Sequence, residues 1–387
     1  MERTIEKPSV KKTDYKPMTY YDYSLLFITL VLICVGLIMV YSTSSYFAIK
    51  QKFGSANYFF NRQLIAAVVG LAGMILVSKF DYHWFTKPFG KKVKFRLIQL
   101  AYLVCVGLQL YAMLFGKEVK GAKRWIELPI IGSFQPSELT KICVILFAAY
   151  MINAAPKRLD NFFGFIWVVF YLSPLIALVA LENLSTAIII CGIVFVLCFV
   201  VTRKKSIYFW IMLGGIGALF AIIKFGKGFR GNRMDAFFHV ETHPDAYQIR
   251  QGLYAIASGG LFGKGLGNST QKLGYIPESH NDMIFSIICE ELGMLGGLIV
   301  ILLFVLLLYR LYVIACNAKD LFGSLICIGI MVHIGMQVVM NIAVVTHTMP
   351  ATGIPLPLIS YGGTSLVVLM LELGLALSVS GRIEYER

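Results

Sequence analysis

The stretch MIFSIICEELGMLGGLIVILLFVLLLY, residues 283–309, decides the class of fold. It is longer than the roughly 20 apolar residues that one bilayer crossing needs, and Glu290 and Glu291 are its only charged side chains. The whole chain of 387 residues shares this bias, with 58% hydrophobic and 14% charged residues. Soluble domains carry about 25% charged residues, so a soluble globular fold is excluded. The composition predicts a polytopic integral membrane protein.

Apolar runs of similar length recur along the chain and define its expected topology. An even number of crossings would place both termini on one side of the membrane. We therefore expect one membrane domain, residues 23–381. It would lie between a cytoplasmic N-terminal tail, residues 1–22, and a cytoplasmic C-terminal end, residues 382–387. Residues 225–281 are expected to form a large extracytoplasmic loop between helices seven and eight. The runs predict an all-α protein with ten transmembrane helices, at residues 24–42, 62–79, 97–115, 137–154, 162–181, 184–202, 207–224, 283–309, 320–345 and 363–380.

The net charge is strongly positive, +14, because 35 Lys and Arg residues outnumber 21 Asp and Glu residues. Basic residues in short loops favour the cytoplasmic side, which supports internal termini, but long loops are exempt from this rule. The predicted outer loops are also basic and need another explanation. All eight cysteines lie in or beside apolar segments, which argues against a disulfide framework or a zinc site. The six histidines show no metal-binding spacing, so the sequence predicts no metal site.

Acidic residues in or beside the apolar runs are candidates for function, because ionisable groups at membrane depth are costly. Asp282 follows Asn281, which we expect to be the N-cap of the eighth helix with Asp282 as its first residue. Asp282 is then either a functional acid or a complement to the helix dipole. Glu138 begins the fourth helix, where it is either functional or paired with Lys141 at i+3.

Glu290 and Glu291 lie about 12 Å further along the same helix than Asp282, at 1.5 Å per residue. They cannot form a close carboxylate pair with Asp282, so we expect them to be structural polar residues between helices. Gly293 and Gly297 form a GxxxG pattern that predicts close helix packing. Candidate partners for the two glutamates share one face of the ninth helix: His333, Gln337 and Asn341.

The large loop contains two further patterns. Ile249, Leu253 and Ile256 repeat at helical spacing, which predicts a short amphipathic helix at the membrane interface. The glycines around Lys264 do not match a nucleotide-binding loop, because Gly265 stands where Ser or Thr is required. They form either a flexible linker or a backbone cradle for another phosphate.

Basic residues on the outer loops have two interpretations: a solvated surface, or a binding rim for an anionic ligand in the outer leaflet. A lipid-linked pyrophosphate would suit cations above apolar helices, and arginine would hold its oxygens in a bidentate fork. The candidates for this rim are Arg124, Arg230, Arg233 and Lys264.

Four segments, in this order and spacing, resemble one family over residues 20–380. The segments are GAKRWI with QPSELTK at 121–126 and 135–141, YQ through GGLFG at 247–263, PESHNDMIF with EELG at 277–293, and TGIPLP through SYGG at 352–363. The family that they resemble is the SEDS proteins (shape, elongation, division and sporulation). The segment GNSTQK, residues 267–272, is more similar to the FtsW division branch and its sporulation relative than to the RodA elongation branch.

The resemblance implies a ten-helix peptidoglycan glycosyltransferase of the bacterial cell membrane that polymerises lipid II. It further implies Asp282 as the essential acid, and functional roles for Arg124, Glu138 and Lys141. The partners would be a class B penicillin-binding protein and other divisome or elongasome membrane proteins, with no nucleic acid. Asp282 would act as base while cations steady the leaving pyrophosphate, with or without a divalent cation, Mg²⁺ or Mn²⁺. A lipid II flippase and a non-catalytic divisome scaffold remain the alternatives.

Overall fold

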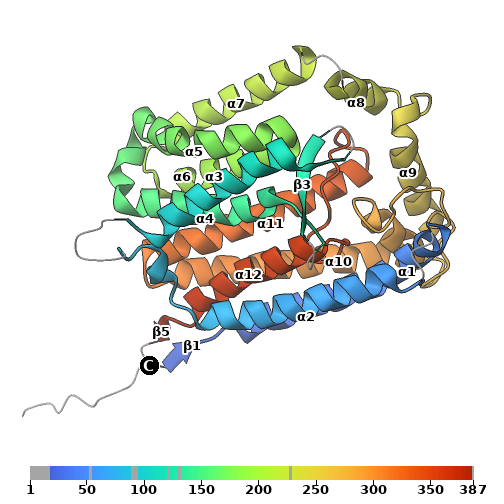
Figure 1. The fold of residues 1–387 in the computed structure, drawn as a ribbon, viewed down its shortest axis with the longest axis horizontal. Coiled ribbons are helices and arrows are strands. Elements are labelled where there is room, and N and C mark those ends of the chain that lie inside the picture. The colour runs from blue at the N-terminus through green and yellow to red at the C-terminus, as the bar shows by residue number, and fades with distance from the viewer. Residues whose placement is uncertain are drawn as a thin grey trace, which may run out of the picture.

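The computed structural model describes residues 18–51, 55–88, 95–119, 122–128, 132–225 and 229–385. Figure 1 shows an elongated bundle in which the long helices run side by side along one direction. The helices are α1 (Tyr23–Lys50), α2 (Tyr58–Lys79), η1 (Tyr82–Phe85), α3 (Leu97–Phe115), α4 (Pro136–Ala154), η2 (Pro156–Asp160), α5 (Phe162–Glu182), α6 (Leu184–Val201), α7 (Lys205–Phe225), α8 (Phe229–Phe238), η3 (Pro244–Ala246), α9 (Tyr247–Gly259), α10 (Ile284–Asn317), α11 (Leu321–Val345) and α12 (Gly363–Ser380). The strands are β1 (Met18–Tyr20), β2 (Lys117–Val119), β3 (Ala122–Leu128), β4 (Gly132–Phe134) and β5 (Ile383–Tyr385).

Every predicted span corresponds to a helix. Within the described residues, nine helices are long and apolar enough to cross a membrane. The remaining predicted span, 207–224, falls on α7, part of which has side chains outside the described part of the chain. Three helices extend well beyond their predicted bounds: α1 continues through a Ser/Thr-rich turn to Lys50, α10 continues to Asn317, and α2 begins four residues earlier, at Tyr58. In α1 two hydroxyls of that turn bond back to their own helix: Thr43 donates to the carbonyl oxygen of Met39 at 2.7 Å, and Ser45 donates to that of Tyr41 at 2.5 Å.

Both ends of the described chain lie on one face of the bundle, as the even number of spans predicts. Strand β1 pairs antiparallel with β5 there. Beside this small sheet, Arg310 donates to Asp22 at 2.6 Å, and Asp22 caps α1 by accepting from the amide of Leu25 at 2.9 Å. We call this end the terminal face (Figure 1). The opposite end, which carries β3, α9 and Asp282, is called the site face. Of the predicted tail, residues 1–17 lie outside the described residues.

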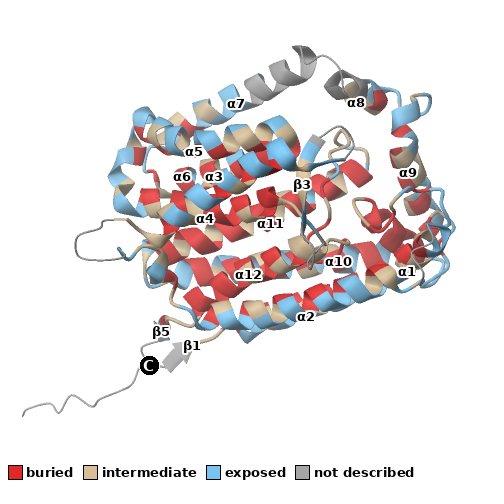
Figure 2. Ribbon diagram, in the orientation of Figure 1, coloured by how far each residue is buried: buried red, intermediate tan, exposed pale blue. Residues whose placement is uncertain are grey.

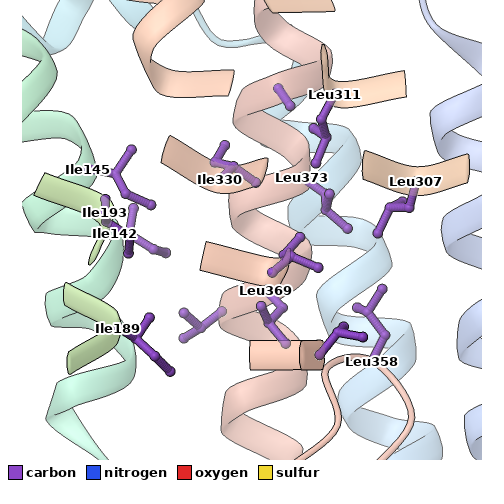
Figure 3. Packing of buried hydrophobic residues seen from close by; sticks show 14 of the residues in the cluster. Ile142, Ile145, Ile189, Ile193, Leu307, Leu311, Ile330, Leu358, Leu369 and Leu373 are labelled. Atoms are coloured by element: carbon purple, nitrogen blue, oxygen red, sulfur yellow. The ribbon is translucent and has the colours of Figure 1, made fainter. Parts of the chain in front are cut away.

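Helices α4, α11 and α12 form the centre of the bundle. Their most apolar windows are 78%, 61% and 72% buried, against 22% for α2 and α3. Figure 2 shows the same pattern, with buried residues inside and exposed residues on the outer helices. The close view in Figure 3 shows isoleucine and leucine side chains of these helices and their neighbours interdigitating. Exposed faces of the peripheral helices are apolar because lipid covers them.

Lipid removes the hydrophobic driving force between helices, so close packing has to hold the bundle together. Small residues at the contacts allow two helices to pack closely. A Cβ at Gly374 of α12 would stand 2.7 Å from the carbonyl oxygen of Met74 on α2. Such contact requires backbones to approach closely, which only glycine permits at this position.

A three-stranded antiparallel sheet between α3 and α4 was not expected from the sequence. Its order is β2-β3-β4, and Lys117 and Glu127 form an exposed ion pair of 2.6 Å across it. Short polar strands of this kind leave little periodicity to detect. The sheet places Arg124 on the site face.

Candidate functional site

The segment between α7 and α10 folds over the site face as α8, η3, α9 and a series of turns. Ile249 and Ala255 of α9 are buried, and Gly252 and Gly259 lie against α10 so closely that a Cβ would overlap Met283 and the backbone of Cys289. The predicted amphipathic helix is therefore confirmed as a helix. Its buried face packs on α10, and its place at the membrane interface stays a prediction.

Helix α10 is interrupted at Gly293, which has φ 72° and ψ −176°. Only glycine adopts this backbone conformation readily. The turn after α9 enters the interruption and exchanges hydrogen bonds with both halves of α10. The bonds are Lys264 N to Glu290 O at 3.0 Å, Gly265 N to Glu291 O at 2.9 Å, Met294 N to Gly260 O at 2.9 Å and Leu295 N to Leu261 O at 3.2 Å.

This exchange explains how a helix can be broken inside a membrane protein. Backbone groups freed at membrane depth need partners from the protein, and residues 260–265 supply them. The GxxxG prediction is wrong at Gly293, which breaks the helix to admit a loop. The glycines near Lys264 are neither a loose linker nor a phosphate cradle, because the amides of Lys264 and Gly265 already donate to protein carbonyls.

Glu290 and Glu291 are fully buried and hold the same segment through ion pairs. Lys264 lies 2.6 Å from Glu290, and Lys272 lies 2.7 Å from Glu291. Ser269 and Ser42 donate further hydrogen bonds to the two carboxylates. The structural role expected for these glutamates fits this geometry, but the expected partners on α11 are wrong. Breaking a buried pair by removing one partner costs about 3–5 kcal/mol, so the Lys272 and Glu291 pair, buried on both sides, anchors the segment firmly to α10.

The polar residues of α11 have other contacts. Gln337 donates to the carbonyl oxygen of Pro355 at 3.2 Å, and His333 lies 2.8 Å from Glu372. Asn341 donates to the backbone oxygens of Asp282 and Ile354, both at 2.8 Å. Asn341 therefore joins the turn that carries Asp282 to the chain segment before α12.

Asp282 lies in the turn before α10. The helix begins at Ile284 with Met283 as N-cap, and the side chain of Asn281 donates to Glu278 at 3.1 Å, so the predicted capping by Asn281 is wrong. Gln248 of α9 donates to Oδ1 of Asp282 at 3.1 Å. Asp282 remains partly accessible, and it is held by contacts from α9 and α11.

Arg233 of α8 and Arg124 of β3 join Asp282 on the site face. Arg233 donates to the carbonyl oxygen of Ala351 at 3.1 Å. Burial lowers the pKa of Arg233, nearby Arg124 lowers it further, and Asp282 acts in the opposite direction. Burial also lowers the pKa of Arg124, against the attraction of Glu182. Arg233 is thus the electrostatic neighbour of both Arg124 and Asp282, and the three predicted residues come from three separate segments.

The other predicted binding residues are placed differently. Glu138 and Lys141 are buried at the start of α4, 3.0 Å apart, and Ser365 donates to Glu138 at 2.8 Å, which confirms the i,i+3 pair. Lys264 pairs with Glu290, further along α10 than the turn of Asp282. Arg230 belongs to α8, but its side chain lies outside the described part of the chain. Direct roles of these residues in substrate binding stay predictions.

Comparison with known proteins agrees with this architecture. The family model described as cell cycle protein, covering FtsW, RodA and SpoVE, matches residues 23–385. The chain belongs to this family. Stage V sporulation protein E of Bacillus subtilis strain 168 is 36% identical to this member over 94% of this chain and 98% of its own. The probable peptidoglycan glycosyltransferase FtsW of Geobacter sp. strain M18 is also 36% identical, over 94% and 97% of the two chains.

Solved structures of the FtsW/RodA/SpoVE family share the fold. RodA of Thermus thermophilus matches with a TM-score of 0.66 and 26% identity, over 95% of this chain and 98% of that one. A chain from a peptidoglycan synthase complex that coordinates polymerization and crosslinking matches with a TM-score of 0.75 and 25% identity, over 93% and 97%. The expected SEDS family and its multi-pass helical membrane fold are confirmed.

Sequence reasoning missed several residues of this family member's site. Gln248 and Glu182 contact or face the predicted site residues, yet each comes from a separate segment of the chain. His280 was also missed. It packs among aromatic rings, with its ring centroid 4.6 Å from that of Phe59 and 5.6 Å from that of Tyr361. Gln248 and His280 lie in the quoted family segments, but nothing local there shows what they contact, because their partners are distant in sequence.

Proposed function

We propose that this chain is a peptidoglycan glycosyltransferase that polymerises lipid II at the outer face of the cytoplasmic membrane. Family membership and relatives named as probable peptidoglycan glycosyltransferases support this proposal. The FtsW and sporulation names among those relatives also favour the division and sporulation branch over the elongation branch.

The position of Asp282 is the observation that carries the proposal. It is partly accessible on the site face, with Gln248 bonded to it and Arg233 as an electrostatic neighbour. The carboxylates inside the long helices are buried away from solvent and contact basic side chains of the protein. These pairs are Glu138 with Lys141, Glu290 with Lys264, Glu291 with Lys272 and Glu372 with His333.

The proposed chemistry needs one carboxylate and nearby cations. The acceptor hydroxyl gives its proton to Asp282 as its oxygen attacks the anomeric carbon of the donor sugar, and the bond to the lipid pyrophosphate breaks with inversion. Pyrophosphate is a stable leaving group, so it needs charge stabilisation and no acid. Arg233 and its neighbour Arg124 would supply that stabilisation. Gln248 orients the carboxylate through its hydrogen bond.

The residues present do not fit a metal ion held by the protein alone. Among the described residues, no group of three His, Cys, Asp or Glu side chains is placed to hold one. Mg²⁺ and Mn²⁺ prefer several oxygen ligands, whereas Asp282 has an amide and an arginine as neighbours. We therefore assign no step to a divalent cation, and its participation stays a prediction.

The flippase alternative would need intramembrane acids along a polar path. Glu290 and Glu291 are instead fully buried in ion pairs, and Glu372 contacts His333. This pairing favours polymerisation at the site face. The proposed assembly joins the chain to a class B penicillin-binding protein, which the likeness to a chain of a peptidoglycan synthase complex supports.

Polymerisation of purified lipid II, followed as glycan chain length on a gel, tests the proposal. Asp282→Asn preserves size but removes the basic oxygen, so synthesis should fall by about 10²- to 10⁴-fold, the usual contribution of a general base. Asp245→Asn, an exposed acid of the same segment, is the matched control and should leave synthesis unchanged. Both are assayed with and without the transpeptidase. Near-normal chains from Asp282→Asn would remove it as the base, and a selective defect in lipid II translocation would favour the flippase.

A further inference from the structure

A polar cluster lies between α3, α5 and β3 on the site face, and the proposed mechanism uses only its arginine. Gln109 of α3 is completely buried and donates from Nε2 to Glu182 at 2.5 Å. Glu182 is the last residue of α5, and Arg124 of β3 is its electrostatic neighbour. We call these three residues the Gln109 cluster.

Each member of the Gln109 cluster has a buried polar atom without a hydrogen-bond partner among the described residues. The atoms are Oε1 of Gln109, Oε1 of Glu182 and Nε of Arg124. Buried polar atoms without partners are rare in native proteins, and each costs about 1–3 kcal/mol. Three such atoms in one cluster therefore indicate that a ligand completes their hydrogen bonds.

The unpartnered atoms define what that ligand offers. Two of them, on Gln109 and Glu182, are acceptors and require a hydroxyl or amide N–H group. The third, on Arg124, is a donor and requires a hydroxyl or carbonyl oxygen. An ionised phosphate offers only acceptor oxygens, so it could not donate to Oε1 of Gln109. A sugar with hydroxyl and N-acetyl groups supplies both kinds of partner.

The Gln109 cluster lies next to the residues proposed to bind pyrophosphate. Arg124 belongs both to the cluster and to the group formed with Arg233 and Asp282. A lipid-linked sugar with its pyrophosphate near the arginines would therefore have its saccharide within reach of Glu182. We propose that Gln109, Glu182 and Arg124 form a saccharide subsite, in which Glu182 and Gln109 accept hydrogen bonds from the sugar part of the substrate. This inference rests on the proposed function.

Two ligands that differ only in the sugar test the subsite. The full-length protein in detergent is titrated with lipid II and with undecaprenyl pyrophosphate, which carries no saccharide. Glu182→Met keeps the volume and removes both oxygens, so Kd for lipid II should rise about tenfold to a hundredfold, as expected for a lost hydrogen bond to a charged group. Kd for undecaprenyl pyrophosphate should stay within about twofold of the wild-type value, on the same scale.

Two further variants make the comparison sharper. Glu182→Gln retains an acceptor oxygen, so its affinity for lipid II should fall less than that of Glu182→Met. The Gln variant also serves as the test if the Met variant folds poorly. Glu127→Met is the matched control, since Glu127 is exposed on the same sheet and pairs with Lys117 at 2.6 Å. It should change neither Kd.

Every outcome bears on the subsite. If Glu182→Met loses equal affinity for both ligands, Glu182 only positions Arg124. If its affinity for lipid II is unchanged, no sugar contacts Glu182. Either result overturns the proposal. Wild-type polymerisation is measured separately. A protein that binds lipid II with Glu182-dependent selectivity but forms no glycan would refute the proposed function and leave the subsite standing, whereas a wild-type protein that binds no lipid II refutes both.

Discussion

Gln248 donates a 3.1 Å hydrogen bond from Nε2 to Oδ1 of Asp282, although 34 residues separate them in the chain. The bond links α9 to the turn before α10. Because α9 is itself tied to the interruption of α10 through the turn that follows it, the orientation of Asp282 depends on the whole segment between Gln248 and Gly293.

Removing that amide should impair catalysis more than binding. In Gln248→Ala the carboxylate loses one orienting bond, and a hydrogen bond to a charged group contributes about 1.5–3 kcal/mol. We expect kcat to fall roughly tenfold or more with KM for lipid II little changed. Tyr254→Phe, on the exposed side of the same helix, serves as control and should change neither constant. A rise in KM at constant kcat would show that Gln248 binds substrate and does not orient the base.

The interruption of α10 should tolerate no side chain. A Cβ at Gly293 would overlap the backbone of Leu261 and Gly263, and the positive φ adds strain. Gly293→Ala should therefore destabilise the protein by several kcal/mol, at the upper end of single substitutions. Thermal unfolding in detergent measures this. Among the described residues, a Cβ at Gly214 of α7 meets nothing within 4 Å, so Gly214→Ala should be harmless. Equal unfolding temperatures for both variants would contradict the backbone exchange described above.

Stability should depend on pH through His280. Burial lowers its pKa to about 4, with Glu278 opposing, below the ordinary value of 6.5. Between about pH 6.5 and 4, His280 is therefore protonated in the unfolded chain and neutral in the folded protein. The free energy of unfolding is at its full value above about pH 6.5 and decreases as the pH falls towards 4. The loss reaches about 3 kcal/mol at 1.36 kcal/mol per pKa unit.

His280→Phe retains a ring among Phe47, Phe59 and Tyr361 and removes the titrating group. Its unfolding temperature should fall less between pH 7.5 and pH 4.5 than that of the wild type. His239→Gln, an exposed histidine, should behave like the wild type. Identical pH profiles for His280→Phe and the wild type would show that other groups cause the acid sensitivity.

The two faces of the bundle should lie on opposite sides of the membrane, with the site face outside. Single cysteines replacing exposed Leu266 on the site face and exposed Glu384 on the terminal face report this, in a background without exposed Cys34, Cys191 and Cys316. An impermeant thiol reagent on intact cells should label only the cysteine at position 266. Labelling at position 384 alone would show that the terminal face lies outside and the site face inside. Labelling at both positions would contradict a closed bundle with both termini inside.

Much of the architecture could be predicted because it follows from local composition. A segment that crosses a bilayer must be apolar over about 20 residues, and this requirement acts on each helix by itself. The bounds of α3 and α12 were therefore predicted to the residue. The Glu138 and Lys141 pair was accessible for the same reason, since residues three apart on a helix are neighbours.

The partners of Glu290 and Glu291 could not be predicted, because two residues on one helix do not reveal which distant segment meets them. Gly293 shows the limit most clearly. In the sequence it belongs to a helix-packing pattern, whereas in the structure a loop passes through the helix there. Only the positions of Gly260 and Leu261 in space decide between these outcomes.

The sequence by itself determined a multi-pass helical membrane protein, its family and the candidate acid Asp282, because apolar length and motif order are properties of the chain. The tertiary structure alone decided that Arg233 and Gln248 lie beside that acid, and that Arg124 lies between Arg233 and Glu182 as their electrostatic neighbour. The physical reason is that each contact joins helix ends or loops that are remote in the chain, and their distances depend on how the whole bundle packs.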